Sequence, residues 1–292
     1  MTKWLTQRLL AALVLCSLAA PALADWGLNL PVGVTPLSKE IYGLHMLIFG
    51  VCCVIAVGVF GAMIYSIVTF RKSKGAVPAQ FHHSTRLEII WTVIPIAILV
   101  AMAIPAAKTL VKIEDTRAAD LTIKVTAYQW KWRYDYADSG VGFFSSLAAD
   151  SVKARQVGSG ADVYAVDHYL RNVDHPVVVP VGKKVRLLIT ANDVIHAWWV
   201  PEIGMKRDAI PGYVNELWFR IDEPGTYRGQ CAELCGRDHG FMPIVVEVKS
   251  PADFDAWLRA KQTEQKLAGV APSATAAVET AVASTAPAVT QQ

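Results

Sequence analysis

The chain has 292 residues, of which 53% are hydrophobic and only 18% are charged. Because soluble domains carry about 25% charged residues, this composition predicts membrane segments and argues against a purely soluble protein. The formal net charge is only +3 and the basic residues form no concentrated patch, so we expect no nucleic-acid partner.

Residues 1–24 have the pattern of a secretory signal peptide. Two basic residues precede the apolar run LLAALVLCSLAA, and the small residues ALA stand directly before Asp25. The apolar run is too short for a membrane helix. We therefore predict cleavage after Ala24, followed by a short segment, residues 25–40, on the outer side of the membrane.

Two long apolar runs follow, with no charged residue over 41–70 and none over 89–107. A bilayer core of about 30 Å needs about 20 helical residues, so we predict transmembrane helices over residues 41–70 and 87–110. The intervening loop, residues 71–86, carries four basic residues and no acidic one. By the positive-inside rule this loop is cytoplasmic, and the chain on either side of the hairpin lies across the membrane from it.

From Leu121 onward the hydrophobic pattern changes to period two. In YQWKWRYDY, polar residues alternate with aromatic ones, which is typical of a β-strand. Further short β-rich runs follow, separated by Gly and Pro. This pattern predicts an antiparallel sandwich or barrel, which we place at residues 113–262, with an irregular insertion at residues 139–170.

The sequence SPADFDAWLRAKQTEQKL predicts a helix that closes the domain. Ser250 can cap this helix, Pro251 fits its first turn, and Asp253 suits its N-terminus. The end of the chain is low in complexity, and we place a disordered tail at residues 263–292.

The loop GQCAELCGRDHGFMP, residues 229–243, contains the residues with the strongest metal-binding potential. Cys231, Cys235, His239 and Met242 follow one another at intervals of four, four and three, between two predicted strands. A second histidine, His196, ends another predicted strand 35 residues before Cys231. Two imidazoles, two thiolates and a thioether form a soft ligand set that suits copper.

Three simpler interpretations of this loop explain less. On the outer side of a membrane a close cysteine pair is by default a disulfide, but a disulfide gives the histidines and the methionine no role. A Cys₂His₂ zinc site leaves Met242 unused, and a mononuclear blue-copper site needs only one cysteine. Two thiolates can instead bridge two copper ions, each bound by one histidine, with Met242 and a backbone carbonyl completing the ligand shells.

Together, these features resemble subunit II of the haem–copper cytochrome c oxidases. The resemblance covers the signal peptide, the helix hairpin, the aromatic strand, VIHAWWVP, MKRDAIPG and the loop above. It implies a membrane-anchored, all-β, cupredoxin-like sandwich in the periplasm, attached to the bacterial inner membrane. It also implies an electron relay from cytochrome c, through a dinuclear copper (CuA) centre, to the haem of subunit I. There oxygen is reduced to water with proton pumping; subunit III and membrane lipid are further implied partners.

The resemblance also assigns roles to individual residues. It implies five side-chain ligands to the two copper ions: His196, Cys231, Cys235, His239 and Met242. Glu233 is implied to bind copper through its carbonyl and, through its carboxylate, a magnesium ion shared with subunit I. Trp130 matches the tryptophan that passes electrons from a docked cytochrome c. Asp135 and Asp138 are acidic residues that we expect to help dock a basic cytochrome.

Glu88, at the cytoplasmic edge of the second predicted span, has two expected roles. Thr85-x-x-Glu88 has the spacing of a capping box, which would stabilise the start of the helix. The resemblance implies instead, or in addition, that the glutamate of LEIIWT marks the mouth of a proton pathway into subunit I.

Three related kinds of protein fit the sequence less well. A quinol-oxidising subunit without metal has no use for the five ligands. A soluble copper reductase such as nitrous oxide reductase needs a second, histidine-rich site, and only seven histidines occur here. A fused subunit with its own haem needs a CxxCH motif, which the sequence lacks.

Overall fold

The computed structural model describes residues 27, 29–80 and 82–269. The predicted signal peptide, residues 1–24, and residues 270–292 of the predicted tail lie outside the described residues. From Val32 onward the described chain belongs to one compact unit.

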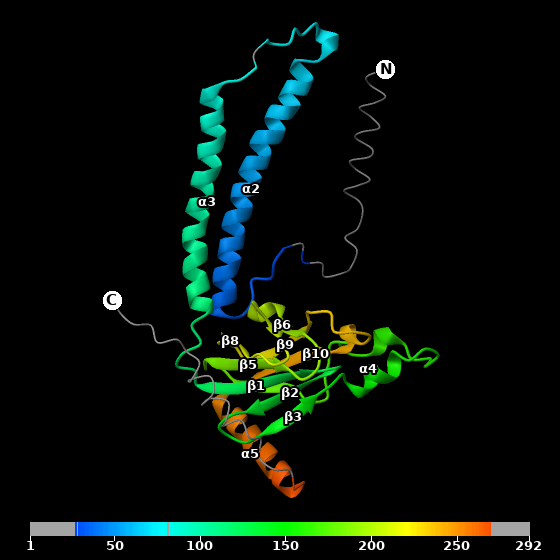
Figure 1. The fold of residues 1–292 in the computed structure, drawn as a ribbon. Helices are drawn as coiled ribbons and strands as arrows, with labels where there is room; N and C mark the ends of the chain where they lie inside the picture. Colours follow the sequence, from blue (N-terminus) through cyan, green and yellow to red (C-terminus); the bar gives the residue numbers. More distant parts are fainter. Residues whose placement is uncertain (1–26, 28, 81, 270–292) are drawn as a thin grey trace, which may run out of the picture. The chain divides into compact units, whose positions relative to one another are not determined.

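Two long apolar helices, α2 (Pro36–Thr69) and α3 (Thr85–Ile113), form a hairpin (Figure 1). Both are long and apolar enough to cross a membrane. Helix α2 begins before residue 41, where we expected it, because Thr35 and Ser38 form a capping box and Pro36 occupies the first turn. A short turn of 3₁₀-helix, η1 (Lys72–Lys74), lies in the loop between the two helices.

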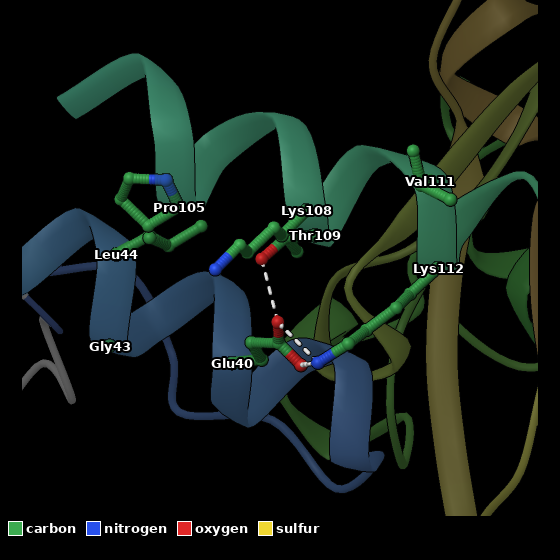
Figure 2. A pocket seen from close by; sticks show the side chains of 8 residues that line it. All are labelled: Glu40, Gly43, Leu44, Pro105, Lys108, Thr109, Val111 and Lys112. Carbon is green, nitrogen blue, oxygen red and sulfur yellow. Dashed lines mark hydrogen bonds and ion pairs between the residues drawn. The ribbon is translucent and has the colours of Figure 1, made fainter. Parts of the chain in front are cut away.

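The end of the hairpin next to the β domain is joined by polar contacts between the two helices. Glu40 accepts hydrogen bonds from Thr109, at 2.7 Å, and from Lys112, at 2.8 and 2.9 Å (Figure 2). The predicted capping box at the other end of α3 is wrong. The N-cap residue of α3 is Ser84, without a side-chain capping bond, so Thr85 already lies inside the first turn.

The β domain consists of two five-stranded sheets (Figure 1). The first sheet has the order β3-β2-β1-β5-β8 and comprises β1 (Leu121–Tyr128), β2 (Lys131–Tyr136), β3 (Gly142–Ser145), β5 (Val185–Ala191) and β8 (Asn215–Phe219). The second has the order β4-β10-β9-β6-β7 and comprises β4 (Val177–Pro180), β6 (His196–Val200), β7 (Met205–Ala209), β9 (Gly225–Cys231) and β10 (Pro243–Lys249). The pairs β1–β5 and β4–β10 are parallel, so the sandwich is mixed and not purely antiparallel as predicted.

The core lies between the sheets and contains large aromatic side chains. Trp198 of β6 stacks on Phe219 of β8 with ring centroids 6.1 Å apart, and its indole nitrogen lies 3.3 Å from the hydroxyl of Tyr134. The Tyr136 hydroxyl accepts from the backbone N–H of Val178 and donates to its carbonyl. These contacts join the two sheets across the core.

The aromatic stretch predicted as one strand is a hairpin. Strand β1 ends at Tyr128 and β2 begins at Lys131, and these two residues face each other across the turn. The alternation continues after the turn: Trp132, Tyr134 and Tyr136 all lie in the core and are at most 1% exposed. The single-strand prediction is therefore wrong, while the buried aromatic face is confirmed for these three residues.

The predicted insertion contains structure of its own: β3, helix α4 (Ala149–Ala154) and the 3₁₀-turn η2 (Val163–Ala165). The closing helix α5 (Pro251–Leu267) is confirmed, and the Ser250 hydroxyl accepts from the backbone N–H of Asp253 as predicted. This helix continues past residue 262, where we placed the end of the domain.

Two short 3₁₀-turns adjoin strands of the second sheet. One, η3 (Pro201–Ile203), follows β6, and the other, η4 (His239–Phe241), precedes β10. Thr35, at the start of α2, donates through its hydroxyl to the carbonyl of Ile203 at 2.9 Å. This contact joins the hairpin to the β domain.

Candidate metal centre

Pairing of β6 with β9 brings His196 close to Cys231. His196 is the first residue of β6 and Cys231 is the last of β9. In this antiparallel pair Trp198 faces Cys231, so the imidazole two residues earlier lies beside the thiol. The Nδ1 atom of His196 is 3.9 Å from the Sγ atom of Cys231, and both side chains are buried.

The loop after β9 folds back over this pair. The Sγ atom of Cys235 lies 3.9 Å from that of Cys231 and 3.5 Å from Nδ1 of His239. The Glu233 carbonyl lies 3.4 Å from the Cys231 sulfur. Met242 is 1% exposed and closes the loop, because its carbonyl accepts from the backbone N–H of Cys231. Five predicted side-chain ligands and one predicted carbonyl thus belong to one loop and the adjoining strand end.

The two thiols of this cluster are free and buried. Their sulfur atoms are 3.9 Å apart, whereas a disulfide requires about 2.05 Å. The ligand-capable atoms of His196, Cys231 and Cys235 all lie within 4.8 Å of one another, so these groups could hold a metal ion. Imidazole nitrogen and thiol sulfur are donors that copper accepts, so the residues fit the predicted metal.

Electrostatics in the cluster favour one thiolate and disfavour a second. Burial alone would raise the pKa of Cys231, but hydrogen bonds with His196 and the backbone outweigh it and lower the pKa. Burial and the neighbouring Cys231 charge raise the pKa of Cys235. A bound metal cation would relieve the repulsion between two thiolates, so both cysteines could be deprotonated in its presence.

Three side chains that the sequence analysis did not single out support the cluster. Asp193 places Oδ1 2.9 Å from Nε2 of His196, which leaves Nδ1 facing the sulfur. The Trp132 ring packs edge-on against the imidazole, with centroids 6.2 Å apart. The Gln129 amide donates to the Cys235 carbonyl at 2.8 Å. The Asp three residues before His196 was a visible signal, but Gln129 gave none.

Trp130 contacts the cluster through the backbone of a predicted ligand. Its indole N–H donates to the Cys235 carbonyl at 3.2 Å. The indole is half-buried, and the Arg237 guanidinium lies 5.5 Å from the ring centroid. The structure therefore places Trp130 between the cluster and the surface.

Two further predicted functional groups, the carboxylates of Glu233 and Glu88, are accessible to solvent. The Glu233 carboxylate is 45% exposed and its Oε2 is 3.9 Å from Nζ of Lys206. Glu88 is exposed in the first turn of α3, on the membrane hairpin.

The expectation that Asp135 helps dock a cytochrome is wrong. Its carboxylate is 7% exposed and paired with Arg133 at 2.8 Å, so it cannot meet a partner. Asp138 is exposed, but it follows the end of β2 that is remote from Trp130. The six residues of β2 lie between them and extend over roughly 20 Å at about 3.3 Å per residue.

The fold and the site together define a class: a cupredoxin-like β domain with a histidine–cysteine cluster that could hold a metal ion, following two apolar helices that suit a membrane anchor. Two family models match the chain. One is described as cytochrome c oxidase subunit II, periplasmic domain, over residues 121–249, and the other as the transmembrane domain of the same subunit, over residues 22–109. The chain belongs to the cytochrome c oxidase subunit II family and is therefore part of an oxidoreductase complex.

Individual relatives agree with this assignment. The chain is 42% identical over 236 residues to the probable cytochrome c oxidase subunit 2 of Rickettsia bellii, covering 81% of this chain and 84% of that one. It is 36% identical over 261 residues to cytochrome c oxidase subunit 2 of Cereibacter sphaeroides, covering 86% of each. Among solved structures, the periplasmic domain of subunit II (CoxB) of Bradyrhizobium japonicum is 41% identical, with a TM-score of 0.45, over 51% of this chain and 98% of that one. The family matches confirm the resemblance inferred from the sequence, and the two apolar helices followed by two packed sheets confirm the fold class.

Proposed function

We propose that this chain receives electrons from cytochrome c at a dinuclear copper centre and passes them to the haem of subunit I. The observation that carries the proposal is the pair of buried, unbonded sulfurs, each with one imidazole Nδ1, at 3.9 and 3.5 Å. Metal–thiolate bonds are about 2.3 Å long, so one ion can contact two sulfurs that are 3.9 Å apart. Bound copper would supply one-electron redox chemistry.

The chain's own residues would perform the positioning. The ends of β6 and β9 hold His196 and Cys231, and the backbone bond between Cys231 and Met242 returns the loop to the sheet. A rigid sheet that holds the ligands limits the rearrangement that accompanies a change of charge. We assign copper to His196, Cys231, Cys235, His239, Met242 and the Glu233 carbonyl.

Copper counting and EPR spectroscopy on the full-length chain, separated from subunit I so that copper held by other subunits is not counted, test this assignment. We expect two copper ions per chain that share one unpaired electron in the EPR spectrum. One copper per chain, or none together with an oxidised cysteine pair, would contradict the proposal.

Trp130 is the residue through which we propose that electrons reach the copper centre. Its half-buried indole and its bond to the Cys235 carbonyl support this role. In Trp130→Ala, we expect electron transfer from cytochrome c to fall at least tenfold, while the copper spectrum stays unchanged. Trp199→Ala, which removes a 39% exposed tryptophan from β6, is the matched control and should transfer electrons normally. Normal transfer in Trp130→Ala would reject the role.

The remaining proposed roles concern the partner subunits, the location in the membrane, and two glutamates. We propose that subunits I and III surround the two helices in the bacterial inner membrane, with the β domain in the periplasm. The exposed carboxylate of Glu233 would bind magnesium together with subunit I. Glu88, which is exposed at the start of α3, would open a proton pathway into subunit I.

A further inference from the structure

The side chain of Arg155 connects the insertion at residues 139–170 to the metal loop, residues 229–243. Arg155, directly after α4, places Nη2 2.9 Å from Oδ1 of Asp238. Its guanidinium carbon also lies 3.8 Å from the centroid of the Phe241 ring. Asp238 directly precedes the predicted ligand His239, and Phe241 directly precedes the predicted ligand Met242. One guanidinium therefore contacts both ends of the turn η4.

Helix α4 is held by burial and by hydrogen bonds to the segment that leads into β4, so it can serve as an anchor. Ser151 and Ala154 are buried, and the Ser151 hydroxyl accepts from the backbone N–H of Leu170 at 3.2 Å. The backbone N–H of Ala148, the N-cap residue, donates to the carbonyl of Asn172 at 3.0 Å. These contacts limit the motion of Arg155 relative to the segment that leads into β4.

The loop segment that Arg155 contacts needs such an anchor. Gly236, at φ +113°, and Gly240 leave the chain on both sides of His239 with unusual backbone freedom. Two backbone bonds, from His239 to Gly236 and from Phe241 to Asp238, are local to the turn. The Gln230 amide donates to the Gly240 carbonyl at 2.7 Å, and the backbone N–H of Cys231 donates to the Met242 carbonyl, so β9 holds the C-terminal end of the turn.

The chemistry of the contact is specific for arginine. The side chains of Arg155 and Asp238 are 28% and 17% exposed, so their hydrogen-bonded ion pair is partly shielded from water. The same planar guanidinium lies over the Phe241 ring, which a lysine ammonium cannot reproduce together with the ion pair. A second arginine, Arg237, approaches the other oxygen of Asp238 at 3.5 Å, but its side chain is 81% exposed.

We propose that Arg155 is a positioning residue that holds His239 and Met242 in place for copper before the metal arrives. This role rests on the proposed copper function. It also gives the insertion a role, because the insertion then stabilises the part of the site that the loop supplies, His239 and Met242. The other half, His196 and Cys231, is held by paired strands.

Hydrogen exchange of the full-length, copper-free chain tests the proposal. In Arg155→Met we expect the amides of His239 and Phe241 to exchange roughly tenfold faster, because the turn loses its contact with α4. Exchange in β6 and β9 should stay unchanged. Asp238→Asn, which keeps the guanidinium–ring contact, and Arg155→Lys, which keeps the charge, should each show part of the effect.

Arg237→Met is the matched control, because it removes the exposed arginine from the same carboxylate. We expect normal exchange in this variant. In the copper-loaded oxidase, Arg155→Met should shift the reduction potential of the metal centre and Arg237→Met should not. Equal exchange in Arg155→Met and the parent chain, or equal effects of the two arginine variants, would overturn the role. So would a lower melting temperature with unchanged exchange and potential.

Failure of this inference is distinguishable from failure of the proposed function. If the parent chain binds no copper pair, the copper assignment fails whatever the exchange shows. If the parent chain binds the pair and Arg155→Met exchanges normally, the copper assignment stands and the role of Arg155 is rejected. Should Arg155→Met fail to fold, Asp238→Asn carries the test alone, and normal exchange there overturns the role.

Discussion

At the scale of single residues, His196 illustrates how a non-ligand side chain sets the chemistry of a ligand. The carboxylate of Asp193 contacts Nε2 of the imidazole at 2.9 Å and also accepts the backbone N–H of Gln129 at 2.7 Å. The contact at Nε2 fixes the tautomer and the orientation of the ring. The second ring nitrogen, Nδ1, therefore faces Cys231.

We expect Asp193→Asn to lower copper affinity by about ten- to a hundredfold, because a neutral amide oxygen accepts the imidazole N–H more weakly than a carboxylate does. Competition with a copper chelator measures the affinity of the full-length chain. Asp208→Asn, which removes a carboxylate that contacts Lys206 at 3.5 Å, is the control and should bind copper normally. Equal affinity in Asp193→Asn and the parent would exclude a role for Asp193 in orienting the ligand.

The residues that the sequence pattern revealed and those it concealed differ in where their partners lie. The loop ligands lie within fifteen positions, and their chemical types alone indicated a soft metal site. Gln129 and Arg155 act on that loop from 106 and 83 residues away, respectively. No spacing rule connects such distant positions, because their proximity depends on the packing of the insertion and the β1–β2 turn.

At the scale of elements, the sequence predicted which faces are buried better than it predicted strand boundaries. The alternation in YQWKWRYDY was correct for the buried face, but the turn after Tyr128 was invisible, because it contains neither Gly, Pro, Asn nor Asp. The parallel pairs β1–β5 and β4–β10 were also missed. Parallel pairing depends on which distant strand lies alongside, and hydrophobic periodicity does not carry that information.

The junction of β5, β8 and the segment after α3 depends on one carboxylate. Arg186 of β5 donates twice to Glu216 of β8, at 2.8 and 3.0 Å, and the Thr116 hydroxyl donates at 2.7 Å. Partial burial would raise the pKa of Glu216, but these hydrogen bonds outweigh it and lower the pKa below its ordinary value of 4.5. The group therefore stabilises the fold above pH 4.5, and that contribution is lost as the pH falls through and below this value.

We expect Glu216→Gln to reduce the free energy of unfolding by about 1–2 kcal/mol at pH 7, with the difference shrinking below about pH 4.5. Denaturant unfolding of the full-length chain in detergent, followed by tryptophan fluorescence across this pH range, measures the effect. Asp222→Asn removes a pair with Arg220 whose side chains are 46% and 51% exposed, and should change stability by at most about 0.5 kcal/mol. A difference that stays constant with pH would contradict the assigned linkage.

At the scale of the whole molecule, a short connection joins the hairpin to the β domain. The indole of Trp218 on β8 donates to the carbonyl of Lys112 at 3.1 Å, and Arg207 on β7 pairs with Glu114 at 2.8 Å. Together with the bond from Thr35 to Ile203, these contacts restrain both helices next to the β domain. The proposed relay to a haem in the membrane benefits from such restraint, because the electron-transfer distance is then set by the fold.

The proposed orientation places the β domain outside the cytoplasm and η1 inside it. We expect a membrane-impermeant charged maleimide to label Asp138→Cys in intact spheroplasts, and to label Ser73→Cys only after the membrane is opened. Both positions are exposed. The parent chain is the control: Cys52 and Cys53 lie within α2, where lipid excludes a charged reagent, and Cys231 and Cys235 are buried. Labelling of Ser73→Cys, but not of Asp138→Cys, in intact spheroplasts would show the opposite orientation and contradict the proposed one. The proposed copper loop would then lie on the cytoplasmic side, away from a periplasmic electron donor, and the basic residues of 71–86 would lie on the outer side, against the positive-inside rule.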